Sequence, residues 1–280
     1  MGSRRRIAAK FRELRARDEA ALIPFIVAGD PDLDTTRRLV LELEARGADL
    51  IELGVPFSDP MADGPANQRA YGRGLGAGAS LAAILAMVGE LREETQIPII
   101  LFGYYNPILH YGCERLCADA ARAGIDGILA VDLPPEESAE LKRPARANGI
   151  DIIYLLAPTT PIERSRRIAQ QASGFLYYVA VTGVTGARDH VGVDVGAKVR
   201  ELRTVTELPI GVGFGISTPE QAASVARFAD AVVVGSAISL MIESHLKTGD
   251  VVESVGSMVE AMKAAMRAAR AGESAAVSTK

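Results

Sequence analysis

The sequence has no tryptophan, only two cysteines and only three histidines. Cys113 and Cys117 lie four apart on an expected helix without a second ligand pair, so they suit helix packing in a reducing compartment better than a zinc site. The histidines, at positions 110, 190 and 245, lack the spacing of a metal or proton-relay site. These absences leave metal catalysis without support in the sequence.

Aromatic residues and net positive charge are also lacking. Only 5% of the 280 residues are aromatic, and the net charge is -4 at pH 7. Broad nucleic-acid binding needs base stacking and a basic surface, so this composition argues against it and favours a small soluble ligand. The basic patch at 4–6 is not followed by a signal-peptide stretch, and no run approaches the roughly 20 apolar residues of a membrane helix. We therefore expect a cytoplasmic protein without membrane contact.

Eight short apolar runs alternate with amphipathic stretches, and 48% of the residues are hydrophobic. Near-continuous apolar runs are typical of strands buried on both faces, and the stretches between them have helical spacing. Eight alternations in a chain of this length favour an α/β fold of the (β/α)8 TIM-barrel type over a doubly wound open sheet. All strand-to-helix loops then open on one rim, where barrel enzymes hold their chemistry. The runs are 22–27, 49–53, 97–102, 127–131, 150–156, 175–181, 209–212 and 231–234.

Both ends of the chain and two loops add to this prediction. Residues 6–20 are predicted to form an extra N-terminal helix that covers the lower end of the barrel, with Phe11 and Leu14 on one side. Thr-Pro pairs at 160–161 and 218–219 each predict a helix N-terminus capped by the threonine. No linker divides the body, so we expect a single catalytic barrel domain over 1–270 and a flexible C-terminal tail over 271–280.

Two carboxylates in and after the second run are the main candidates for chemistry. Glu52 lies inside an apolar strand, where the period of two places it on one face with Leu50 and Gly54. Charged side chains are rarely buried without a purpose, although a structural ion pair would also account for this one. A proline-rich loop then folds back and ends in Asp63, which either faces Glu52 or is a solvated turn residue. Asp132, after the fourth run, is a weaker candidate that could hydrogen-bond loops.

Three glycine-rich loops follow the last three runs, at 181–188, 211–217 and 234–238. Glycine lets backbone N–H groups approach an anion, and Ser236, at the start of a short helix, would add the positive end of that helix. Tight turns would explain any one loop, but three together favour a phosphate site on the rim. The first of these loops, extended over 182–198, is predicted to be a mobile lid that hydrogen-bonds Asp63 through Thr185 when closed.

A series of motifs runs along the chain at 24–31, 52–65, 104–107, 132–134, 183–186, 213–217 and 235–236. The most specific is Glu-Leu-Gly-Val-Pro-Phe-Ser-Asp-Pro with its Asp-Gly-Pro sequel, within 52–65. Over about residues 7–265 these motifs resemble the tryptophan synthase alpha chain family. The resemblance implies a lyase of tryptophan and aromatic amino-acid biosynthesis. It would cleave indole-3-glycerol phosphate into indole and glyceraldehyde 3-phosphate by a retro-aldol step, with no cofactor or metal in this chain.

The resemblance also implies roles for individual residues. Glu52 matches the acid–base group that gives a proton to indole C3 and takes one from the neighbouring glycerol hydroxyl; burial would hinder its ionisation and keep it able to donate. Asp63 matches the carboxylate that holds the indole N–H, and Tyr177 the residue that assists Glu52. The indole pocket would include Phe25, Phe102 and Thr185, and the phosphate site Gly186, Gly215, Gly235 and Ser236.

A partner is implied in the same way. The family's alpha chain works with a beta chain that uses pyridoxal phosphate, in an α2β2 heterotetramer, and this sequence has no pyridoxal phosphate motif of its own. Pro56, Asp59 and Pro60 on the second loop and Asn106 on the third match the surfaces that meet that partner. A rigid turn would equally suit the prolines.

Two positions depart from the family pattern. Asn67 stands where many members carry an apolar residue against indole, and Val181 where some carry an arginine in the lid. Neither touches the two proton transfers, so they bear on substrate affinity and lid closure rather than on the reaction type.

Three other functions compete with this one. A ring-closing indoleglycerol phosphate synthase would need a catalytic lysine in the barrel, whereas Lys142 and Lys198 fall in helical or loop stretches. A stand-alone lyase that releases free indole would differ only in leaving the docking loop unused, which the sequence leaves open. A non-catalytic activating subunit is disfavoured because both carboxylates are present.

Overall fold

Parallel strands form the centre of the protein, whose computed structural model describes residues 6–180, 191–213 and 215–277. Within those residues the strand order is β5-β4-β3-β2-β1-β9-β8-β7-β6. β5 and β6 are consecutive in the chain and separated by Ile153 alone, so the sheet curls into a nearly closed barrel. The (β/α)8-barrel prediction is confirmed. The strands are Ala21–Val27 (β1), Ile51–Gly54 (β2), Ile99–Gly103 (β3), Gly127–Ala130 (β4), Asp151–Ile152 (β5), Tyr154–Leu156 (β6), Leu176–Val179 (β7), Ile210–Gly213 (β8) and Ala231–Val234 (β9).

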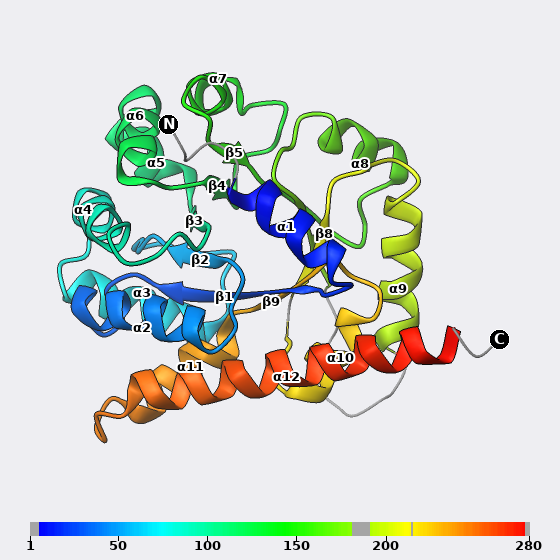
Figure 1. Ribbon diagram of the computed structural model, residues 1–280. Coiled ribbons are helices and arrows are strands. Elements are labelled where there is room, and N and C mark those ends of the chain that lie inside the picture. The colour runs from blue at the N-terminus through cyan, green and yellow to red at the C-terminus, as the bar shows by residue number, and fades with distance from the viewer. Residues whose placement is uncertain (1–5, 181–190, 214, 278–280) are drawn as a thin grey trace.

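The helices surround these strands, as Figure 1 shows. Among the described residues, no single helix is long and apolar enough to cross a membrane; α3 and α4 pass that test only as a pair bent by 89°. The helices are Arg6–Ala16 (α1), Leu33–Ala45 (α2), Pro65–Gly76 (α3), Leu81–Leu91 (α4), Tyr105–Tyr111 (α5), Cys113–Ala123 (α6), Ala139–Ala147 (α7), Ile162–Ala169 (α8), Val191–Leu202 (α9), Pro219–Ala226 (α10), Ser236–His245 (α11) and Val251–Val277 (α12).

The extra N-terminal helix is present. Ile7, Phe11 and Leu14 of α1 are buried in the same cluster as the residues that fill the barrel interior, and the rings of Phe11 and Phe175 lie 5.8 Å apart. In Figure 1, α1 lies across the strands at the centre of the picture. The helix therefore closes the amino-terminal end of the barrel, which leaves the opposite rim for the loops that follow the strands.

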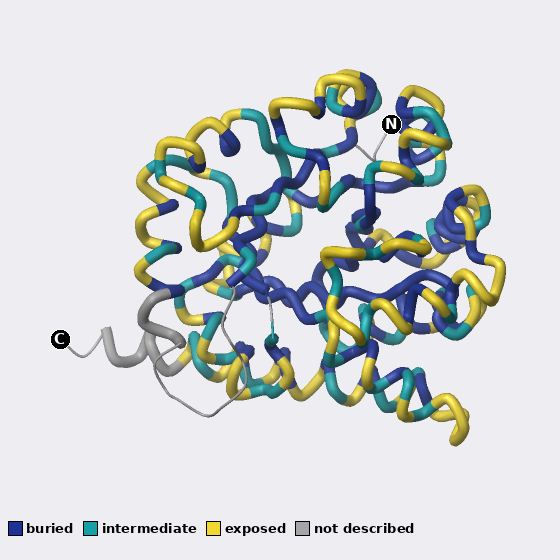
Figure 2. The backbone as a smooth tube through the Cα atoms, turned by 180° about the vertical axis from the view of Figure 1, so that it is seen from behind, coloured by how far each residue is buried: buried dark blue, intermediate teal, exposed yellow. Residues whose placement is uncertain are grey.

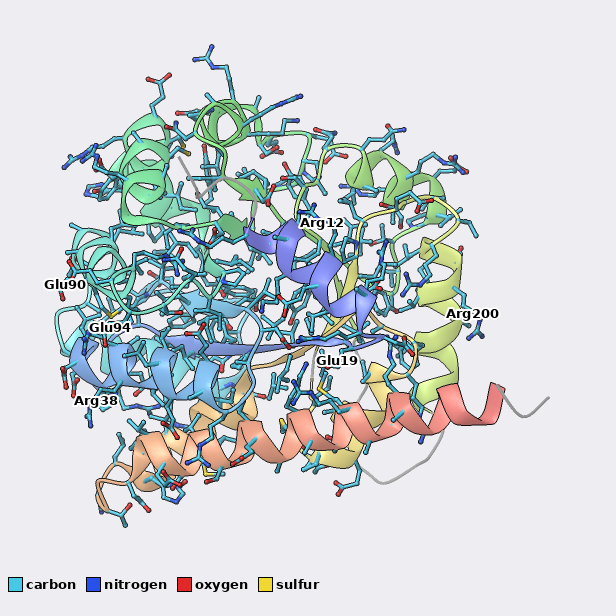
Figure 3. The ribbon with its side chains drawn as sticks, viewed as in Figure 1. Arg12, Glu19, Arg38, Glu90, Glu94 and Arg200 are labelled. Carbon is cyan, nitrogen blue, oxygen red and sulfur yellow. The ribbon has the colours of Figure 1, made fainter. Side chains whose placement is uncertain are left out.

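The period of two along each strand sorts the core into two layers. Leu50 of the second run packs inside the barrel with Ile23 and Ile100, whereas Ile51 and Leu53 pack between the strands and the helices. Figure 2 shows the buried strands enclosed by helices whose outer sides are exposed. In Figure 3 the labelled charged side chains on these helices, Arg38, Glu90 and Arg200, point away from the barrel.

Four expectations need correction. The fifth run is two short strands, because its first half pairs with β4 and its second half with β7. Thr218 caps α10 through a capping box, but Pro161, not Thr160, is the N-cap residue of α8, and the Thr160 hydroxyl accepts a hydrogen bond from the Ala157 N–H instead. The expected lid does not extend to residue 198, because α9 begins at Val191. α12 runs to Val277, past the expected start of the tail at 271, and the flexibility of that tail stays a prediction.

The two cysteines lie on α6 and are buried in the helix-facing core, as the packing interpretation predicts. Among the described residues there is no group of three or more His, Cys, Asp or Glu side chains that could hold a metal ion.

Candidate active site

Glu52 lies inside the barrel on β2, in register with Phe25 on β1 and Ile100 on β3. Its side chain is 0% exposed, and neither carboxylate oxygen has a hydrogen-bond partner among the described residues. A structural ion pair therefore does not account for this residue. Burial alone raises the pKa of Glu52 to about 8, because an apolar surrounding disfavours the charged form.

Two tyrosines share the site with Glu52. Tyr177 points inward from β7, where burial raises the pKa of its hydroxyl and the carboxylates of Glu52 and Asp63 raise it further. Tyr71 on α3 is also fully buried; its hydroxyl has no hydrogen-bond partner among the described residues, and its pKa is raised by burial and then by Asp63. Sequence reasoning missed Tyr71, although it lies four residues after Asn67 and so on the same face of a helix.

Glycines make room for these groups at the upper ends of the strands. A Cβ on Gly213 would lie 2.4 Å from Tyr177 Oη, and a Cβ on Gly54 would lie 2.8 Å from Phe25 Cζ. Both contacts are closer than any side chain allows. Gly54, in the strand of Glu52, and Gly213, at the end of β8, therefore have a steric reason for being glycine.

Asp63, on the loop after β2, is half-buried and held by donors on both oxygens. Asn67 Nδ2 donates to Oδ1 at 3.1 Å, and Tyr104 Oη donates to Oδ2 at 2.6 Å. Burial raises the pKa of Asp63, while these two hydrogen bonds act in the opposite direction. This carboxylate is part of an ordered network and not a solvated turn residue. Tyr104, which follows β3, belongs to the motif at 104–107, but the sequence does not predict its contact with Asp63.

A cluster of aromatic rings lies beside Glu52, whose neighbour on β1 is Phe25. The rings of Phe25 and Phe102 are 5.0 Å apart and roughly edge to face, and Phe25 makes a similar contact with Tyr71 at 6.5 Å. Phe25 is buried, and Phe102, near the end of β3, is partly exposed. Thr185, the third residue expected in the indole pocket, lies outside the described residues, as does Val181.

The loops after β8 and β9 meet at the same rim. Ser217 and Ser236 line one surface pocket, and Gly215 has a φ of +73°, which favours glycine. Gly235 is the N-cap of α11 and offers no side chain to the N–H groups at the start of that helix. The N–H groups at the start of α11 suit an anion. The pocket itself is lined further along by Glu243 and by apolar side chains such as Leu240 and Met258. Gly186 lies outside the described residues.

The expected docking residues are spread over different surroundings. Asp59 and Asn106 are exposed and Pro60 is partly exposed, whereas Pro56 is buried, with its Cγ 2.9 Å from the site of a Cβ on Gly74. Pro56 therefore stiffens the loop from inside. Two exposed apolar side chains that the sequence reasoning missed lie close to these positions in the chain: Met61 is 86% exposed and Leu109 is 48% exposed.

Asp132 hydrogen-bonds a neighbouring loop, as the sequence analysis suggested. Its Oδ1 accepts a hydrogen bond of 2.7 Å from the Tyr105 backbone N–H, which ties the loop after β4 to the start of α5. The residue thus supports the rim and shows no contact with Glu52 or Asp63.

The fold and the site define a (β/α)8-barrel enzyme that places one buried, protonatable carboxyl group and one ordered carboxylate beside aromatic rings at its carboxyl-terminal rim. A family model described as tryptophan synthase alpha chain matches residues 11–267. The chain belongs to this family, so it is a lyase subunit of tryptophan biosynthesis, as its motifs predict.

Individual relatives agree with this assignment. The chain is 57% identical over 258 residues to the tryptophan synthase alpha chain of Citrifermentans bemidjiense, covering 92% of this chain and 96% of the relative. It is 50% identical over 271 residues to that of Gluconacetobacter diazotrophicus, covering 95% and 99%. A crystal structure of tryptophan synthase subunit alpha from Legionella pneumophila superposes with a TM-score of 0.86 at 40% identity, covering 93% of this chain and 98% of that one.

Proposed function

We propose that this chain cleaves indole-3-glycerol phosphate into indole and glyceraldehyde 3-phosphate, with Glu52 as the group that moves the protons. The observation that carries the proposal is the isolated carboxyl group of Glu52: fully buried, without a hydrogen-bond partner among the described residues, and with a pKa near 8. A carboxyl group in this state is protonated at neutral pH and free to bond a substrate.

The reaction requires two proton movements that one group can perform in turn. Protonated Glu52 gives its proton to indole C3, which leaves a cationic ring and a carboxylate. The carboxylate then takes the proton of the neighbouring glycerol hydroxyl, the carbon–carbon bond breaks, and its electron pair returns to the ring. The hydroxyl carbon becomes the aldehyde of glyceraldehyde 3-phosphate, and Glu52 ends protonated as it began.

Asp63 supports this reaction by holding the indole N–H. The ring becomes positively charged when C3 is protonated, and a carboxylate at the nitrogen stabilises that charge. Asp63 already accepts hydrogen bonds from Asn67 and Tyr104, so its position is set before the substrate arrives. Phe25 and Phe102 supply the apolar walls for the ring, and Tyr177 lies beside Glu52.

The phosphate group would be bound by the loops after β8 and β9. Gly215, Gly235 and Ser236 supply backbone N–H groups and a hydroxyl, and the uncapped start of α11 adds a partial positive charge. Gly186 and Thr185 would complete the phosphate and indole sites. The phosphate would then fix the glycerol end, which places the reacting carbon near Glu52.

A beta chain that carries pyridoxal phosphate is the proposed partner, in an α2β2 complex located in the cytoplasm. The loop after β2 and the start of α5 would form the docking surface, with Asp59, Pro60 and Asn106 at its centre and Pro56 as internal support. Met61, which follows Pro60 and is 86% exposed, would add an apolar contact to this surface. Met61→Asp should weaken the complex in sizing experiments, whereas Leu246→Asp, at the exposed C-cap of α11, should not.

The alternative functions are less well supported. Family membership favours the alpha-subunit role over a stand-alone lyase. A ring-closing synthase would need a lysine in the barrel, but Lys142 lies on α7 and binds Gln171, and Lys198 lies on α9 and pairs with Glu201. Lys263 is buried at the amino-terminal end of the barrel strands, far from the rim that holds Glu52's loop, and there it binds Asp49.

The test of the proposed function is indole release from indole-3-glycerol phosphate by the purified chain, with and without a beta chain. Glu52→Gln should abolish release while a glycerol phosphate analogue still binds. Asp132→Asn is the matched control, because it makes the same change on the same rim, and its amide oxygen can still accept from Tyr105. Turnover in the Glu52 variant would refute the assignment, as would equal losses in both variants.

A further inference from the structure

Three hydrogen-bonded polar side chains join the loop after β2 to α11, the helix at whose start the phosphate is proposed to bind. Asn67 Nδ2 donates to Asp63 Oδ1 at 3.1 Å, and Ser239 Oγ donates to Asn67 Oδ1 at 2.9 Å. Asn67 lies on α3, four residues after Asp63, and Ser239 is a buried residue in the first turns of α11. Asn67 is the residue that stands where an apolar side chain is common in the family.

The roles of donor and acceptor in this chain follow from chemistry. An ionised carboxylate can only accept, so Asn67 must turn its NH2 group toward Asp63. Its carbonyl oxygen then faces Ser239, whose hydroxyl must donate to it. This orientation of the amide satisfies both neighbours, whereas the opposite one would set the amide oxygen against the Asp63 carboxylate, even though the Ser239 hydroxyl could then accept from the NH2 group.

A second contact between the same two helices has no link to Asp63. Arg69 on α3 forms a two-pronged ion pair with Glu243 on α11, with both distances at 2.7 Å, on the exposed surface. Arg73, one turn further along α3, also contacts Glu243, at 3.3 Å. Of these polar contacts between α3 and α11, only the hydrogen bond between Asn67 and Ser239 continues to Asp63. This separation allows a positioning role to be distinguished from a structural one.

We propose that Asn67, supported by Ser239, is a positioning residue that fixes the Asp63 carboxylate relative to α11, and so relative to the bound phosphate. The proposal rests on the proposed lyase function, since Asp63 acts there on the indole N–H. The phosphate of the substrate would bind at the start of α11, and Asp63 is held to the same helix through Asn67 and Ser239. The distance between the bound phosphate and the Asp63 carboxylate would therefore stay constant.

The hydrogen bond from Asn67 also favours the ionised form of Asp63. The other titratable groups near Asp63 are Tyr104, which donates to its second oxygen, and Tyr71 and Tyr177, whose pKa values the Asp63 charge raises. Glu52, beside Tyr177, is neutral below about pH 8. Loss of the amide donor should therefore raise the pKa of Asp63 and free one oxygen to move.

The test compares Asn67→Leu, which has nearly the same volume, with Arg69→Gln and with the double variant Asn67→Leu, Ser239→Val. Asn67→Leu should lower kcat for indole release about tenfold, as expected for one hydrogen bond to a charged group, with little change in the affinity for glycerol phosphate. The acid limb of its kcat/KM profile should move to higher pH. Arg69→Gln should leave both quantities within about twofold of the parent.

The double variant separates catalysis from stability. Replacing both partners by apolar groups should restore the thermal midpoint that the single variant loses, because no buried hydroxyl is left unpaired. Turnover and the acid limb should stay as in Asn67→Leu. Recovery of turnover in the double variant, or an equal loss in Arg69→Gln, would overturn the proposal. An NMR titration of Asp63 in the free protein needs no turnover: an unmoved midpoint in Asn67→Leu would refute the positioning role even if the lyase assignment failed.

Discussion

Tyr104 and Asp63 are joined by a hydrogen bond of 2.6 Å from the tyrosine hydroxyl to Oδ2, although they follow different strands. The same hydroxyl accepts a hydrogen bond of 2.9 Å from the Ala62 backbone N–H. With its acceptor side occupied in this way, the hydroxyl is oriented to donate to the carboxylate. The end of β3 therefore orients the carboxylate that ends the loop after β2.

This contact predicts a loss of activity in Tyr104→Phe. The variant removes a donor that favours ionised Asp63, so kcat/KM should fall about tenfold and its acid limb should move to higher pH. Steady-state kinetics across the acid range check this. Tyr105→Phe is the control, because that hydroxyl faces Cys113 and Glu140, away from Asp63, and it should leave the profile in place.

The raised pKa of Glu52 should make the protein less stable at high pH, although the same residue is needed for activity. Its pKa is about 8 in the folded chain and near 4.5 when unfolded, so the folded state binds the proton more tightly between those values. The parent's unfolding free energy should therefore decline as pH rises from about 4.5 to about 8, on the order of 1.4 kcal/mol for each pH unit. Glutamine does not titrate, so Glu52→Gln should escape this loss.

Denaturant unfolding of the parent and Glu52→Gln at several pH values measures the difference. Glu52→Gln should be more stable than the parent in alkaline solution. The difference in unfolding free energy between the two proteins should shrink as the pH is lowered toward 4.5, the pKa of Glu52 in the unfolded chain. A gap that is independent of pH would mean that Glu52 titrates in the fold as it does in the unfolded chain.

The close approach of Gly213 on β8 to Tyr177 can be tested by adding a methyl group. A Cβ on Gly213 would fall 2.4 Å from Tyr177 Oη and 2.9 Å from Val233 Cβ, so Gly213→Ala should displace Tyr177 and cost about 1 to 3 kcal/mol of stability. Gly211→Ala, on the same strand, meets Phe175 only at 3.3 Å and should be milder. Thermal unfolding and indole release report the two effects. Equal behaviour of the two variants would contradict the packing described for Tyr177.

The barrel and the face on which Glu52 lies could be predicted because they depend on local signals. Apolar runs identify strands, and the period of two places residue 52 on the same face as Leu50 and Gly54, which the structure shows to be the barrel interior. The cap at Thr218 could also be predicted, since the two residues of its capping box, Thr218 and Gln221, are only three positions apart in the sequence. At Thr160 the same pattern failed, because the hydroxyl is used by the loop before the helix.

The polar network around Asp63 could not be predicted in the same way. Tyr104, Asn67 and Ser239 come from three different elements, and only the closure of the barrel brings them together. Pro56 shows the same limit: a proline in an exposed-looking loop turns out to be buried against Gly74. Such contacts depend on tertiary packing that no short-range pattern encodes.

The central claim, that Glu52 is a neutral acid at physiological pH, is tested most directly by its own titration. The carboxyl C=O stretch of Glu52, obtained as an infrared difference between the parent and Glu52→Gln, can be followed across the pH range together with kcat/KM. We predict that the band persists through neutral pH and disappears with a midpoint of about 8, where the alkaline limb of kcat/KM also falls. A midpoint near 4.5, with Glu52 ionised throughout the active range, would contradict the account.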